Sequence, residues 1–176
     1  MPLHIVFLEL IIDPACSIAF ESEPEDPRIM DRPPRNPGSR IFDRQTITSG
    51  IFQGICLMVI TLGAFLVSLY RGQGAADARA ISFTTLILAN LALIWSNRSR
   101  SRIIPELFGA RNTALWGITG GALGLLAAVL YIPWFRDLFQ FSTLHVPDLG
   151  VCIFLALLSV TWFEISKLRG RQGKRG

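Results

Sequence analysis

Two carboxylates, Glu9 and Asp13, lie in the middle of an apolar stretch near the start of the chain, LHIVFLELIIDPACSIAFE from Leu3 to Glu21. An Asp in hydrocarbon costs about 2.5–3.5 kcal/mol on insertion scales, so acidic residues in membrane helices generally mark an ion or proton pathway. A spacing of four places both on one face of a helix, with Ser17 one turn further along. We therefore predict that Glu9 and Asp13 bind a transported cation, with Ser17 as a further candidate ligand.

Pro14 follows Asp13 directly and affects the backbone at this point. It has no N–H to donate to the carbonyl of Leu10, and its ring biases Asp13 away from helical geometry. We expect the helix to be locally unwound there, so that freed carbonyls join the two carboxylates around an ion. The alternative is that Glu9 and Asp13 are structural residues, either protonated or paired with another helix.

The ligand chemistry restricts the choice of ion. Oxygen ligands favour calcium, magnesium, manganese, sodium or protons over copper and zinc, and two carboxylates favour a divalent ion. The predicted cargo is therefore calcium or another hard divalent cation.

The composition indicates the kind of element that positions these residues. Of the 176 residues, 51% are hydrophobic and the mean hydropathy is +0.44, with the apolar residues in long runs between short charged connectors. This pattern is typical of a polytopic membrane protein. The net charge of +4 does not indicate nucleic-acid binding, because the basic residues lie in alternate connectors. Three widely separated cysteines indicate neither a zinc cluster nor a disulfide framework.

The predicted fold class is all-α, a polytopic membrane helix bundle with five transmembrane helices. The expected segments are a first transmembrane helix carrying the cation-site carboxylates (1–21), a cytoplasmic loop rich in proline and arginine (22–45), a four-helix transmembrane bundle (46–168) and a basic cytoplasmic tail (169–176). The four later spans are expected at about 46–70, 80–96, 113–132 and 149–168.

The charges in the connectors predict the orientation. Of the 17 Lys and Arg residues, only Arg71, Arg79 and Arg136 fall in connectors on the side opposite to the proline-rich loop. Cytoplasmic connectors carry the excess of Lys and Arg, so the loop and the C-terminus should be cytoplasmic and the N-terminus external. We expect a multi-pass protein of the plasma or inner membrane.

Several other residues in the predicted spans and connectors have roles that their types suggest. Asn90 in the third span is a further candidate ligand, but an interhelical hydrogen bond is the commoner use of such a residue. Glu164 should pair with a basic neighbour or face water, and Trp134, Phe135 and Phe139 suit the bilayer interface. Four glycines at spacings of three and four indicate a helix-packing face, since a phosphate loop would be misplaced in hydrocarbon: Gly117, Gly120, Gly121 and Gly124.

Two motifs resemble the C-terminal membrane domain of P-type cation-transporting ATPases, the class that includes calcium and sodium–potassium pumps. FLELIIDPACSIAFE is similar to the family's sixth transmembrane helix, whose cation-binding Asp matches Asp13. The run IMDRPPRNP, Ile29 to Pro37, closely resembles the family's loop between its sixth and seventh helices. Beyond about Arg44 the similarity lies mainly in hydropathy and topology, with four more spans where the family has its seventh to tenth helices.

Three departures from calcium pumps of muscle reticulum bear on the choice of ion. Those pumps have an Asn at the position of Glu9 and a Thr at the position of Ile12. The side chain of Ile12 supplies no oxygen. Leu88 stands where their eighth helix has a Glu. The resemblance therefore fits one cation, held by Glu9, Asp13 and groups from the fourth and fifth helices, better than two calcium ions.

The resemblance implies partners that are not in this sequence. The family's phosphorylated Asp-Lys-Thr-Gly-Thr motif is not present, so ATP and magnesium would act only through the nucleotide-binding and actuator domains of a pump. The chain alone should not hydrolyse ATP, and its expected partners are those domains, the remaining helices and the lipid bilayer. An alternative is a stand-alone membrane protein that docks to a pump and regulates or scaffolds it. A small channel or carrier would leave the proline–arginine loop unexplained.

Overall fold

The computed structural model describes residues 2–21, 44–97 and 113–172, and every regular element in them is an α-helix. The prediction of an all-α fold is confirmed. The helices are α1 (Pro2–Glu21), α2 (Arg44–Tyr70), α3 (Ala75–Asn97), α5 (Thr113–Tyr131), the short α6 (Pro133–Phe139) and α7 (Val146–Gln172). Most of the predicted proline–arginine loop (22–43) and the end of the predicted tail (173–176) lie outside the described residues.

The helix lengths fit a membrane bundle. About 20 apolar residues are needed to cross the hydrocarbon core. Within the described residues, three helical stretches are long and apolar enough to do so: Ile47–Tyr70, Ala75–Asn97 and Thr113–Tyr131. α7 contributes the shorter apolar stretch Val146–Trp162, and α1 is 20 residues long. These five long helices occupy the positions of the five predicted spans.

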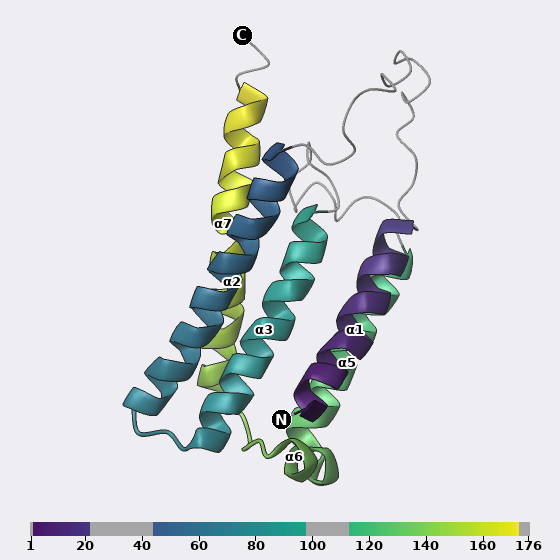
Figure 1. Cartoon of the computed structure of the whole chain (residues 1–176). Helices are drawn as coiled ribbons and strands as arrows, with labels where there is room; N and C mark the ends of the chain where they lie inside the picture. The colour runs from purple at the N-terminus through teal and green to yellow at the C-terminus, as the bar shows by residue number, and fades with distance from the viewer. Residues whose placement is uncertain (1, 22–43, 98–112, 173–176) are drawn as a thin grey trace.

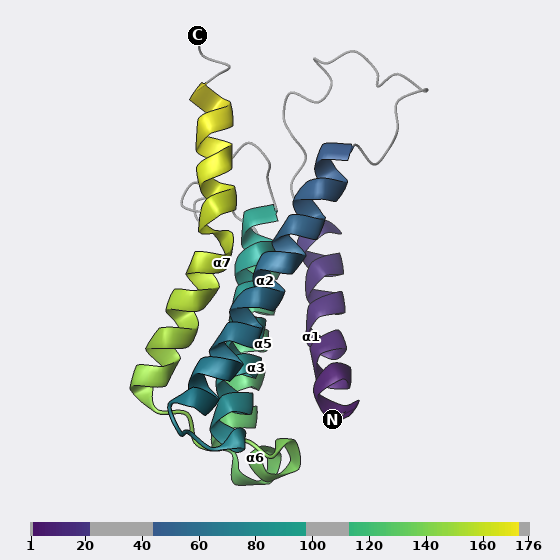
Figure 2. The same ribbon diagram turned by 60° about the vertical axis from the view of Figure 1, so that its left-hand side comes forward.

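α3 is the central helix. It packs against α2 and α7 on one side and against α1 and α5 on the other (Figure 1). α1 overlaps α5 in Figure 1, and after the turn it stands apart at one edge of the bundle, on the side away from α7 (Figure 2). α3 is largely enclosed, whereas α2 exposes a long apolar face. Such a face is suited to contact with lipid or with another helix.

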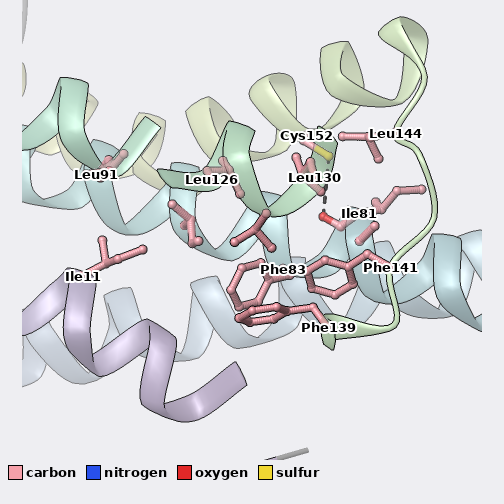
Figure 3. Packing of buried hydrophobic residues seen from close by; sticks show 14 of the residues in the cluster. Ile11, Ile81, Phe83, Leu91, Leu126, Leu130, Phe139, Phe141, Leu144 and Cys152 are labelled. Atoms are coloured by element: carbon pink, nitrogen blue, oxygen red, sulfur yellow. Dashed lines mark hydrogen bonds between the residues drawn. The ribbon is translucent and has the colours of Figure 1, made fainter. Parts of the chain in front are cut away.

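The buried core joins α3 to its neighbours and to the segment after α6. Figure 3 shows Phe83 of α3 beside Phe139 and Phe141, while Ile11 points from α1 toward the same core. The thiol of Cys152 on α7 donates a 3.5 Å hydrogen bond to the carbonyl of Ile81 on α3. The core therefore connects helices that are distant in the sequence.

The prediction that Phe139 lies at the bilayer interface is wrong, since its side chain is 3% exposed. α6 begins with Pro133 in its first turn and is capped at its C-terminus by Gln140, which adopts a left-handed backbone conformation with φ 54°. This turn directs the chain back so that Phe139 and Phe141 both enter the core. Trp134, in contrast, is 68% exposed.

The predicted unwinding beside Asp13 is also wrong. α1 is helical without interruption from Pro2 to Glu21, with Pro14 inside it. A proline removes one backbone hydrogen bond, but a transmembrane helix tolerates this where local adjustments and neighbouring groups satisfy the freed carbonyl. The backbone therefore supplies no unwound segment as a ligand at this point.

The glycines of α5 do not form the predicted close packing within the described part of the chain. A Cβ built on Gly117, Gly120, Gly121 or Gly124 would meet nothing within 4 Å. The buried side of α5 is formed by larger residues instead, among them Leu115, Ala122, Leu126, Val129 and Leu130. All four glycines are exposed.

Candidate cation site

The predicted carboxylates share one side of α1. Glu9 and Asp13 are four residues apart in a helix that is continuous through Pro14, so they lie one turn apart on the same face. Ser17 extends this line by another turn, and all three side chains are exposed. The opposite side of α1 carries Phe7 and Ile11, which pack into the core. The structure therefore brings the two carboxylates together but does not enclose them.

Asn90, the other candidate ligand, lies on α3 and is half-buried. Its side-chain amide donates a 2.9 Å hydrogen bond to the carbonyl of Leu86, one turn earlier in the same helix. Among the described residues it makes no hydrogen bond with Glu9 or Asp13. The structure thus does not combine Asn90 with the carboxylates into one site.

A complete cation site needs more oxygen ligands than α1 offers. Calcium takes six to eight oxygen ligands, and magnesium takes six in a near-octahedral arrangement. Within the described residues, no three side chains of the types His, Cys, Asp and Glu converge as they would around a metal ion. Glu9 and Asp13 alone would therefore supply only part of the oxygen ligands that such an ion takes.

A cavity between α1 and α5 is separate from the carboxylates. It has a volume of about 190 Å³ and is lined by Leu10, Ile11, Pro14 and Ile18 of α1 and by Ile118, Gly121, Ala122 and Leu125 of α5. Its lining side chains are all apolar, so they offer no ligand for an ion. The cavity is open on one side rather than enclosed, and α1 and α5 are in contact around it.

Sequence reasoning missed a set of polar contacts at the C-terminal end of α3. Three consecutive residues there bond to three different helices. Trp95 donates to Thr119 of α5 at 3.1 Å, and Ser96 donates to Glu164 of α7 at 2.5 Å. Asn97 and Gln53 of α2 exchange two amide hydrogen bonds of 3.1 Å. The only signal in the sequence is the adjacent polar pair Ser96-Asn97 at the end of an apolar run.

Comparison with known proteins identifies relatives along nearly the whole chain. The family model described as "Cation transporting ATPase, C-terminus" matches residues 1–169. A calcium-transporting ATPase of Bacillus subtilis is 26% identical over 141 residues, which is 80% of this chain and 16% of that protein.

Two further relatives come from distant organisms. A calcium-transporting ATPase of Listeria monocytogenes is 29% identical over 173 residues, covering 94% of this chain and 19% of the relative. The mouse calcium-transporting ATPase type 2C member 2 is 28% identical over 168 residues, covering 94% of this chain and 17% of the relative. The chain thus spans less than a fifth of the length of each of these relatives.

Proposed function

Because the chain belongs to the family of cation-transporting ATPase C-terminal domains, the membrane part of P-type pumps, we propose that it supplies Glu9 and Asp13 as ligands for a transported cation. It is a multi-pass membrane protein, and its helices α1, α2, α3, α5 and α7 would correspond to the sixth to tenth helices of a pump. ATP hydrolysis would belong to domains outside this chain.

One observation carries the proposal: two carboxylates lie side by side on the exposed face of a helix whose other face is packed. In a membrane, this face cannot stay against lipid without a large cost in free energy. Covering it with further helices that carry oxygen groups removes that cost and completes a coordination shell around a cation. The proposal therefore places the fourth and fifth helices of a pump against Glu9 and Asp13.

Calcium is the cation that we propose. The relatives are named as calcium-transporting ATPases. Two carboxylates balance the charge of one divalent ion, and hard oxygen ligands suit calcium better than zinc or copper. Ile12, on the same helix, offers no side-chain oxygen, which supports a single ion rather than two.

The test replaces each carboxylate by its amide in the complete pump. In Glu9→Gln and Asp13→Asn, the calcium concentration that gives half-maximal phosphorylation should rise at least about tenfold, which corresponds to roughly 1.4 kcal/mol of lost binding free energy. Glu21→Gln is the matched control, because Glu21 is an exposed carboxylate at the far end of the same helix. Unchanged calcium dependence in both site variants, in a pump that is phosphorylated normally, would reject the assignment.

A further inference from the structure

The N-terminal turns of α1 insert two aromatic rings into a cluster of three phenylalanines. The ring of His4 lies 5.7 Å from that of Phe83, 5.3 Å from Phe139 and 5.1 Å from Phe141, in each case edge to face. The ring of Phe7, one turn along, lies 5.7 Å from Phe83 and 5.1 Å from Phe139. These distances fall in the range where aromatic pairs add stabilisation beyond the burial of their area.

The three phenylalanines form what we call the phenylalanine socket: Phe83, Phe139 and Phe141. Their rings also contact one another, with centroids 5.2 to 6.1 Å apart, and each side chain is at most 5% exposed. Figure 3 shows the three rings gathered between α3 and the segment after α6. The socket is therefore a closely packed group that does not depend on α1 for its own contacts.

Hydrogen bonds from the first turns of α3 fix the segment that carries two of these rings. Arg79 donates a 3.2 Å hydrogen bond to the carbonyl of Gln140, which lies between Phe139 and Phe141. The hydroxyl of Ser142 donates to the carboxylate of Asp77. Because both neighbours of Phe141 are bonded to α3, which itself carries Phe83, the socket is a fixed reference for α1.

His4 and Phe7 lie on the side of α1 opposite to the carboxylates. At 3.6 residues per turn, the mean direction of His4 and Phe7 differs from that of Glu9 and Asp13 by about 180°. Phe7 and Glu9 are only two residues apart in a continuous helix. Any rotation of α1 in the socket therefore turns the carboxylates by the same angle.

Further along α1, the contact with α5 is made by aliphatic side chains around an apolar cavity. We propose that His4 and Phe7 are positioning residues for the cation site: seated in the phenylalanine socket, they set the rotation of α1 and so the direction of Glu9 and Asp13. This inference rests on the proposed function, since it assumes that the two carboxylates bind the ion. The inference adds His4 and Phe7 to the residues on which cation binding depends, although neither contacts the ion.

The experiment measures calcium-dependent phosphorylation of the complete pump. In Phe7→Ala, the half-maximal calcium concentration should rise roughly three- to tenfold, the size expected for a change that acts through another residue. The maximal level of phosphorylation should stay near that of the unmodified pump. His4→Ala should behave alike, whereas His4→Phe, which keeps a ring in the socket, should restore the calcium dependence.

Phe154→Ala is the matched control, because Phe154 on α7 is 63% exposed and lies outside the socket. If Phe7→Ala leaves the half-maximal calcium concentration unchanged, or lowers only the maximal phosphorylation, the positioning role is overturned. If Phe7→Ala does not assemble, Phe7→Leu gives the same test with a smaller change in volume. Failure of the proposed function would look different, because Glu9→Gln and Asp13→Asn would then also leave calcium dependence unchanged.

Discussion

The hydroxyl of Ser96 is fully buried between α3 and α7 and donates a 2.5 Å hydrogen bond to the carboxylate of Glu164. The sequence predicts a basic partner or water for Glu164. The structure shows a hydrogen-bond partner that this prediction does not include, a serine on α3, 68 residues earlier. A serine at the end of an apolar run has no feature that identifies its partner. Only the packing of α3 against α7 reveals it.

This hydrogen bond should contribute measurably to stability. We expect Ser96→Ala to lower the free energy of unfolding by about 0.6–2 kcal/mol, the range measured for hydrogen bonds between membrane helices. The measurement is thermal unfolding of the purified chain in detergent. Thr161→Ala is the control, since Thr161 on α7 is exposed and its hydroxyl donates to the carbonyl of Leu157 in the same helix. An equal loss in both variants would mean that the contact with Glu164 adds nothing.

The sequence predicts where the long helices form, but it does not predict which helices contact one another. Runs of about 20 apolar residues predict the long helices because length and composition alone determine whether a helix can span hydrocarbon. The common face of Glu9 and Asp13 followed from their spacing. The burial of Phe139 and the open glycine face of α5 depend instead on which helices become neighbours, and local periodicity carries no such information.

Pro14 gives a test of the continuous α1. We expect Pro14→Ala to raise the unfolding temperature, because the new N–H can bond to the carbonyl of Leu10 and interior prolines cost a helix up to about 3 kcal/mol. Pro133→Ala is the matched control: Pro133 lies in the first turn of α6, where an N–H has no helical partner, so its replacement should change little. A fall in the unfolding temperature of Pro14→Ala would show that the proline ring is needed beside the cavity.

In the part of the molecule that the structure describes, the long helices run side by side and begin and end at two opposite ends of the bundle. The N-terminal end of α1, the turn between α2 and α3, and α6 are all at one end (Figures 1 and 2). The C-terminal ends of α1, α3 and α7 are at the other. This arrangement is the alternation that a chain crossing a membrane repeatedly must have.

The distribution of charge gives this bundle a predicted orientation. The basic residues Arg71, Arg79 and Arg136 belong to the end with α6, whereas the other 14 of the 17 Lys and Arg residues fall in the sequence segments 28–44, 98–111 and 167–175. Since the excess of positive charge stays in the cytoplasm, we expect the C-terminus inside and the turn at Gly72 outside. Paired reporter fusions test this, one active only outside the membrane and one fluorescent only inside. A reporter at the C-terminus that is active outside would reverse the orientation, and the phenylalanine socket would then lie at the cytoplasmic end of the proposed cation site.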